Sequence, residues 1–117
     1  MRRLIASTLV LLALVAGSAR ATSQRTAATT PITVKAGEFF FKLSKGSIAK
    51  PGTVVFTVEN VGHLAHDLKI AGKKTALIQP GKSARLKVVF SKKGHFKYVC
   101  TVPGHAANGM EGTFVVR

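Results

Sequence analysis

Hydrophobic and polar residues alternate with a period of two in several short runs beyond residue 30 of this 117-residue chain. Alternation of this kind predicts β-strands that each bury one face. Turn-forming residues separate the runs, at Pro51-Gly52, Asn60-Val-Gly62, Pro80-Gly81 and Lys93-Gly94. The sequence has no long helical pattern and no internal repeat, so an all-β sandwich or barrel of short strands is predicted. The alternating runs are residues 39–44, 53–58, 85–90, 96–101 and 114–116.

The strand before the only cysteine sets the expected direction of its thiol. In residues 96–101, Phe96, Tyr98 and Cys100 fall on one face, and the intervening side chains fall on the other. We therefore expect the thiol to point inward together with the two aromatic rings.

Three residues with metal-binding side chains follow one another near the C-terminus. Cys100, His105 and Met110 are spaced as C-x4-H-x4-M in a Gly- and Pro-containing loop, and a further imidazole, His66, lies upstream. Two His, one Cys thiolate and a weak axial Met form the ligand set of blue-copper electron-transfer sites. Structural zinc sites lack the thioether, and catalytic iron sites need carboxylates, of which this chain has only four.

Each of these residues has an ordinary structural interpretation when it is taken alone. A lone Cys is most often a small buried hydrophobe, and a lone His in a strand is most often a satisfied polar residue. The ordered set of four, at a spacing that loops can accommodate, favours a metal site instead. His63 and His95 have no companion at ligand spacing, and we interpret them as surface or structural histidines.

These segments resemble the cupredoxins, the small type 1 blue-copper proteins of the plastocyanin and azurin family. The resemblance rests on residues 60–67 and 98–112, and a framework similarity extends over residues 32–116. The C-x4-H-x4-M spacing is most similar to that of auracyanin and rusticyanin.

The resemblance implies a Greek-key β-sandwich that holds one type 1 copper ion. It assigns His66, Cys100 and His105 as strong ligands and Met110 as the axial ligand. It also implies that His105 lies near the surface among small residues such as Ala106, where a redox partner could approach closely. An ordinary tight loop is the alternative interpretation of these small residues.

Asp67 departs from the family pattern, because many cupredoxins have Asn directly after the first His ligand. In that family the side chain joins the two ligand loops by hydrogen bonding near the Cys, and Thr101 is the expected partner here. The added negative charge of Asp67 is expected to favour the oxidised Cu(II) state.

The N-terminal residues have the pattern of a secretory signal peptide. An Arg pair precedes a short apolar stretch, and small residues surround a cleavage point after Ala21. The apolar stretch is short for a membrane span, and an uncleaved anchor is the alternative interpretation. We expect an exported protein, located in the periplasm or in another extracellular or cell-envelope space. The expected organisation is a signal peptide at residues 1–21, a flexible leader at 22–30 and one copper-binding domain at 31–117.

The chain is strongly basic, with 18 Lys and Arg against four acidic residues and a formal net charge of +14. A field of this sign attracts acidic partners, so we expect redox proteins with acidic docking surfaces, and an anionic membrane surface is a second candidate. Nucleic acid is not expected, because the predicted export and the lack of a recognisable binding motif argue against it. A solvated basic surface without a specific partner is the alternative. We expect a monomer.

The ligand set and the predicted export indicate a one-electron carrier whose copper cycles between Cu(I) and Cu(II). The alternative is a copper-binding protein for copper trafficking or storage. Such proteins tend to use Met-rich or exposed thiol sites, whereas here Met110 is the only Met beyond residue 21 and Cys100 is expected to face inward. An enzyme is not expected. A copper oxidase or nitrite reductase needs a further copper site with an open position, and His63 and His95 are too few to build one.

Overall fold

The computed structural model of the protein describes residue 17 and residues 29–117. Apart from residue 17, the predicted signal peptide lies outside the described residues, as do residues 22–28 of the predicted leader. Strand β1 (Thr29–Gly37) begins before the predicted start of the domain at Pro31. Its first two residues belong to the strand and not to a leader, because they continue the parallel pairing of β1 with β4 (Gly52–Asn60).

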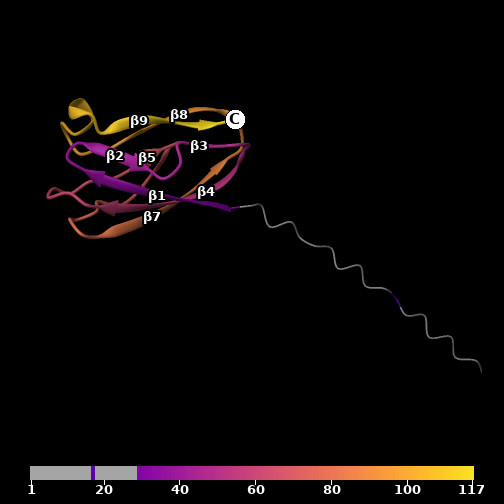
Figure 1. Ribbon diagram of the computed structural model, residues 1–117, viewed down its shortest axis with the longest axis horizontal. Coiled ribbons are helices and arrows are strands. Elements are labelled where there is room, and N and C mark those ends of the chain that lie inside the picture. The colour runs from indigo at the N-terminus through magenta and orange to yellow at the C-terminus, as the bar shows by residue number, and fades with distance from the viewer. Residues whose placement is uncertain (1–16, 18–28) are drawn as a thin grey trace, which may run out of the picture.

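In the described part of the chain, nine strands form two sheets that pack face to face (Figure 1). The four-stranded sheet has the order β2-β1-β4-β7, and the five-stranded sheet has the order β3-β9-β8-β5-β6. The predicted fold class, an all-β Greek-key sandwich, is confirmed. The other elements are β2 (Phe40–Leu43), β3 (Ser47–Ile48), β5 (Lys69–Ile70), β6 (Lys73–Lys74), β7 (Ser83–Phe90), β8 (Gly94–Val99), β9 (Glu111–Val116) and the short 3-10 helix η1 (Ala106–Asn108).

Every second side chain along the middle of β1, β4 and β7 is buried against the opposite sheet. The parallel pairing of β1 with β4 and the antiparallel pairing of β4 with β7 set this register. A slip of one residue would turn the whole apolar face to solvent, so the alternation in the sequence specifies the register. The buried side chains are Ile32, Val34, Ala36, Val54, Phe56, Val58, Leu86, Val88 and Phe90.

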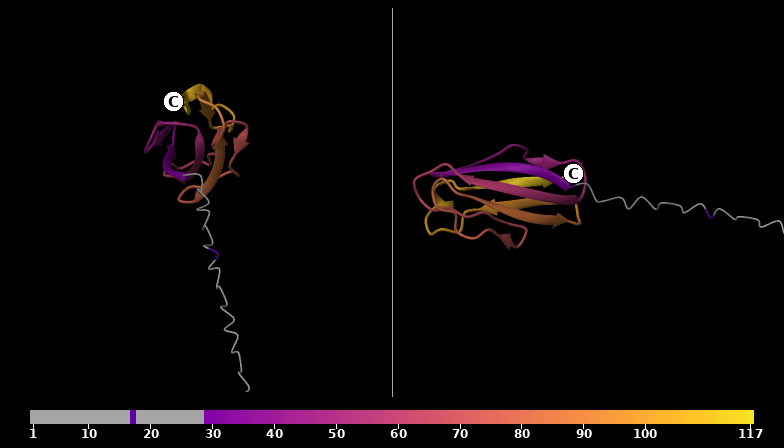
Figure 2. Two further views of the ribbon diagram at one scale, coloured as in Figure 1. Left: turned by 90° about the vertical axis from the view of Figure 1, so that its right-hand side faces the viewer. Right: turned by 90° about the horizontal axis from the view of Figure 1, so that it is seen from below.

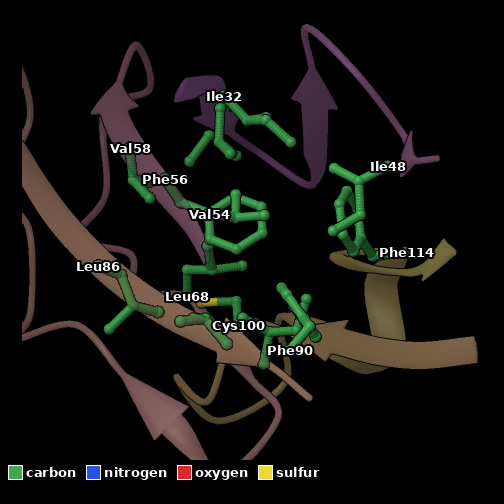
Figure 3. Packing of buried hydrophobic residues seen from close by; sticks show 14 of the residues in the cluster. Ile32, Ile48, Val54, Phe56, Val58, Leu68, Leu86, Phe90, Cys100 and Phe114 are labelled. Carbon is green, nitrogen blue, oxygen red and sulfur yellow. The ribbon is translucent and has the colours of Figure 1, made fainter. Parts of the chain in front are cut away.

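Phenylalanine rings from both sheets fill the centre of the sandwich. The ring centroids of Phe56 and Phe114 are 5.5 Å apart with their planes at 79°, and those of Phe90 and Phe114 are 5.4 Å apart. The Phe56–Phe114 contact is edge-to-face, a geometry that is favourable for aromatic pairs, and the Phe90–Phe114 pair is tilted, with its planes at 33°. Figure 3 shows these rings in one cluster with Leu68 and Cys100. The single thiol therefore belongs to the apolar core.

The loops that follow β4 and β8 lie at the same end of the sandwich, opposite the C-terminus (Figures 1 and 2). The strands β3, β5 and β6 are not predicted by the alternation of the sequence, because strands of two residues have no measurable period. Among residue 17 and residues 29–117, no helix has the length and apolar character needed to cross a membrane.

Replacement of Phe56 by Ala should lower the free energy of unfolding by about 3–5 kcal/mol, because it removes a fully buried ring and leaves a cavity between the sheets. Urea unfolding of the apo-protein, followed by circular dichroism, would measure the loss. Val89→Ala is the matched control on the same sheet, since Val89 is 66% exposed, and it should cost less than about 1 kcal/mol. Equal losses in the two variants would contradict the place of Phe56 in the core.

Candidate metal centre

Cys100 lies directly after strand β8 and is 1% exposed. Phe96 and Tyr98, on the same face of the strand, pack against the buried cluster that contains Cys100. The predicted inward direction of the thiol is therefore confirmed. The end of β8 thus delivers the sulfur to the interior at the loop end of the sandwich.

Residues 100–110 form a compact loop that satisfies much of its own backbone hydrogen bonding. The N–H of Cys100 donates to the carbonyl of Met110 (3.0 Å), and the N–H of Met110 donates to the carbonyl of His105 (3.1 Å). Gly109 ends the helix η1 with a φ of 115°, a conformation that favours glycine. The loop therefore holds its three candidate ligands in a fixed relation to one another.

His66 comes from a different loop, between β4 and β5, and backbone pairing holds it in place. The N–H of His66 donates to the carbonyl of Ile78 (3.1 Å), and the N–H of Ile78 donates to the carbonyl of His66 (2.7 Å). The side-chain amide of Asn60 donates to the carbonyls of Leu64 (2.7 Å) and Ile78 (2.8 Å). Asn60, the last residue of β4, therefore anchors the loop that carries His66.

Three donor atoms from these two loops face one another in a buried site. The Nδ1 atoms of His66 and His105 lie 3.1 Å apart. The Sγ atom of Cys100 lies 4.0 Å from Nδ1 of His66 and 3.6 Å from Nδ1 of His105. Within the described residues, this is the one group of three or more His, Cys, Asp or Glu side chains with donor atoms all within 4.8 Å of one another. Side chains from distant parts of the sequence therefore meet as ligands of a single ion do.

Burial affects the protonation of two of these donors. It lowers the pKa of His66, against the opposing effect of nearby Glu38, and so favours the neutral imidazole that binds metals. Burial also raises the pKa of the Cys100 thiol, while the backbone N–H groups of Asp67 and Val102 act in the opposite direction by hydrogen bonding. The same N–H groups stabilise a thiolate once a metal cation has displaced the thiol proton.

Met110 completes the set of four residues that the sequence indicates. It is fully buried, and its backbone is hydrogen-bonded to both Cys100 and His105. A thiolate, two imidazoles and a thioether are soft or intermediate ligands, which suit copper better than Mg²⁺ or Ca²⁺. The three facing donor atoms are close enough to contact one ion at bond lengths of about 2.0–2.3 Å. The residues of the site therefore fit a copper ion.

Asp67 joins the two ligand loops through Thr101, as the sequence predicts. The backbone N–H of Thr101 donates to Oδ1 of Asp67 (2.6 Å), and the hydroxyl of Thr101 donates to Oδ2. Asp67 is only 5% exposed, and hydrogen bonds to a carboxylate are stronger than those between neutral groups. The carboxylate therefore ties the loop after β4 to the loop after β8, beside His66 and Cys100.

The side chains of the two remaining histidines do not belong to the group of donor atoms. His63 and His95 are both exposed, and neither belongs to the group of donor side chains. His95 is a residue of β8 and pairs with Val115 of β9. The prediction that these two histidines are surface or structural residues is confirmed.

His105 is the most exposed of the four candidate ligands. It retains 7% of its surface, whereas His66, Cys100 and Met110 retain 1% or less. Phe39 packs edge-on against the His105 ring, with centroids 5.0 Å apart and planes at 66°. The half-buried Phe39 thus packs against the His105 ring, and the small exposed part of His105 lies at the loop end of the sandwich.

Two residues beside the site are not predicted by the sequence. The Oε1 atom of Glu38, between β1 and β2, lies 3.4 Å from Nε2 of His66. Phe39 appears in the sequence only as a strand residue, although its ring contacts His105. One feature of the sequence could have drawn attention to Glu38 as a candidate site residue. It is one of only four acidic residues in a basic chain, and it directly follows a strand that ends in Gly37.

Solved structures of auracyanins share the fold. The reduced auracyanin of the photosynthetic bacterium Roseiflexus castenholzii is 22% identical with a TM-score of 0.64, and the similarity covers 78% of this chain and 98% of that chain. Auracyanin A, a "blue" copper protein of the green thermophilic photosynthetic bacterium Chloroflexus aurantiacus, is 18% identical with a TM-score of 0.64, over 77% of this chain and 100% of that chain. At these identities the similarity establishes the cupredoxin fold.

Sequence comparison identifies the family. The copper-resistant cuproprotein CopI of Pseudomonas aeruginosa PAO1 is 40% identical over 43 residues, which are 37% of this chain and 24% of that protein. Residues 21–117 match the family of copper-binding proteins described as the plastocyanin/azurin family. The match spans most of the chain and includes all four candidate ligands, whose chemistry fits the metal. The chain therefore belongs to the plastocyanin/azurin family of copper-binding proteins, and copper is its cofactor.

Proposed function

We propose that the protein is an exported blue-copper protein that acts as a one-electron carrier. In this proposal His66, Cys100 and His105 are the strong ligands of one type 1 copper ion, and Met110 is the axial ligand. Bound copper would supply one-electron chemistry by alternating between Cu(I) and Cu(II). The observation that carries the proposal is the convergence of one buried sulfur and two buried imidazole nitrogens.

The contacts of the chain itself support a carrier, because they hold the ligands in position independently of the oxidation state of the metal. The loop of residues 100–110 is closed by its own backbone hydrogen bonds, and Asp67 ties it to the His66 loop. A site supported in this way changes little in shape when its charge changes. Small rearrangement means a low barrier to electron transfer, which is what a carrier requires.

We propose that electrons enter and leave at the His105 end of the site. His105 is the most exposed candidate ligand, and the neighbouring Pro103 and Gly104 are exposed. Small side chains at this surface would let a partner approach closely. The net charge is +14 for the full sequence, and it is +11 without Arg2, Arg3 and Arg20 of the proposed signal peptide. A charge of this sign supports a redox partner with an acidic docking surface, which the field of the protein would attract. The signal-peptide pattern of residues 1–21 supports export.

Copper trafficking or storage is the second candidate function. The partial similarity to a protein described as a copper-resistant cuproprotein favours it. A protein that delivers copper must release the ion to a recipient, and the near-complete burial of three candidate ligands favours a resident ion instead. Transfer of Cu(I) to a soluble chelator separates the two functions, because a resident ion leaves slowly and a cargo ion leaves on mixing.

We do not propose an enzymatic activity for the chain. A copper oxidase or nitrite reductase needs a second metal site with an open position for substrate. The described residues hold one group of donor side chains, and the exposed His63 and His95 lie outside it. The site therefore supports electron transfer rather than substrate conversion within this chain.

Addition of Cu(II) to the apo-protein should produce an intense blue absorption band that reductant bleaches and oxidant restores, because the Cys100 thiolate would bind the metal directly. Cys100→Ala should lose this band completely. His95→Ala, which removes an exposed histidine outside the site, is the matched control and should keep the band. Copper bound by the natural protein without a blue band would contradict the type 1 site and favour trafficking.

Ala106→Glu should slow electron exchange with an acidic redox partner about tenfold or more. The substitution places a negative charge beside His105, and this charge repels the negative docking surface of the partner. Stopped-flow kinetics at low salt would measure the exchange, and the blue band should keep its intensity and position. Val89→Glu adds the same charge at an exposed position of the four-stranded sheet and serves as the control. An exchange rate equal to that of the control would exclude His105 as the route for electrons.

A further inference from the structure

One nitrogen of the metal centre is buried without a partner. The Nε2 atom of His66 is inaccessible to solvent and has no hydrogen-bond partner among the described residues. Because Nδ1 of the same ring faces Cys100 and His105, the ring proton must be on Nε2 when Nδ1 binds a metal. A buried N–H group of a ligating histidine almost always donates to a carboxylate, a carbonyl or a water molecule. Among the described residues, the carboxylate oxygen paired with this nitrogen is Oε1 of Glu38, at 3.4 Å.

Glu38 is itself fixed by the loop that carries His66. Its Oε1 atom accepts hydrogen bonds from the backbone N–H groups of His63 (2.6 Å) and Leu64 (2.5 Å). Gly62 makes room for the carboxylate, because a Cβ atom at this position would lie 2.3 Å from Oε2 of Glu38. The carboxylate is therefore seated against the loop by three consecutive residues rather than extended into solvent.

The loop that holds Glu38 also stabilises its negative charge. Desolvation acts to raise the pKa of Glu38, but the backbone N–H groups of Leu64, His63 and Glu38, together with the charge of His66, lower the pKa overall from its usual value. Glu38 thus brings a negative charge to the outer side of the His66 ring, opposite the side that faces the metal site.

We propose that Glu38 is a positioning residue of the copper centre, whose carboxylate accepts the Nε2–H of His66 and holds Nδ1 toward Cys100. This inference rests on the proposed function, in which His66 is a copper ligand. Orientation follows from the geometry, since a ring held at Nε2 cannot rotate away from the site. The negative charge has a second effect, because it favours the more positive Cu(II) state and so lowers the reduction potential.

Two substitutions separate orientation from charge. Glu38→Gln keeps an oxygen acceptor at nearly the same position and removes the charge, whereas Glu38→Ala removes both. Glu59→Gln removes the same charge from a different element, strand β4, and is the matched control. Gly62→Ala keeps Glu38 but places a methyl group where the carboxylate sits, and it should reproduce the effect of Glu38→Ala on His66.

The first measurement is made on the apo-protein and needs no copper. In the ¹⁵N NMR spectrum of the natural protein, the Nε2–H of His66 should be observed and slow to exchange with water. Glu38→Gln should retain this signal, and Glu38→Ala and Gly62→Ala should lose it through faster exchange. Retention of a slowly exchanging signal in Glu38→Ala would overturn the positioning role.

The second measurement uses the Cu(II)-loaded protein. At a fixed ambient potential near the midpoint, Glu38→Gln should raise the ratio of reduced to oxidised protein about tenfold, which corresponds to 59 mV for a one-electron couple. Glu59→Gln should change the ratio less than about twofold, because among the described residues the ion pair of His66 is made with Glu38 and not with Glu59. Equal ratios of reduced to oxidised protein in Glu38→Gln and Glu59→Gln would overturn the proposed effect of the Glu38 charge on the reduction potential. A natural protein without a blue band would reject the proposed function, and the apo-protein measurement would still decide the role of Glu38.

Discussion

The arrangement of the metal centre depends on the connection between two loops through the Asp67 carboxylate. Asp67 and Thr101 are 34 residues apart in the sequence, and their two hydrogen bonds fix one loop on the other. The sulfur is on one side of this connection, and His66 is on the other. If the connection were loose, the distance between Cys100 and His66 would vary with every motion of the loops. A metal-binding geometry that is ready before the metal arrives requires this contact.

The sandwich beneath the loops makes such a connection effective. The aromatic core around Phe56 and Phe114 holds the two sheets together, and each sheet contributes a strand that leads directly into the site. Burial then acts on the donors themselves, since it disfavours a charged imidazole and a free thiolate. The interior is therefore unfavourable for these groups as separate charges and favourable for a cation shared by all of them. Burial of the donor side chains is therefore the common cause of their packing, their protonation and their preference for a metal ion.

The sequence predicts the long strands and the ligand set well, because both leave a local signal. Alternation identifies the buried faces of β4, β7 and β8, and the spacing of Cys100, His105 and Met110 identifies the C-terminal loop. Three features leave no such signal. Strands of two residues have no period, the pairing that makes Thr29 part of β1 is made with a distant strand, and Glu38 reaches His66 only through the fold. Contacts between distant segments are set by topology, which a local pattern does not contain.

The closed hydrogen bonding of residues 100–110 has a consequence for how such a protein can change. A backbone hydrogen bond joins the N–H of Cys100 to the carbonyl of Met110 across the base of the loop. The segment between these two residues therefore begins and ends at the same point of the sandwich. A segment anchored in this way is interchangeable: its length can vary while the strands on either side keep their register. The metal centre can thus acquire new properties by exchange of one short segment, and the framework that stabilises the protein is left intact.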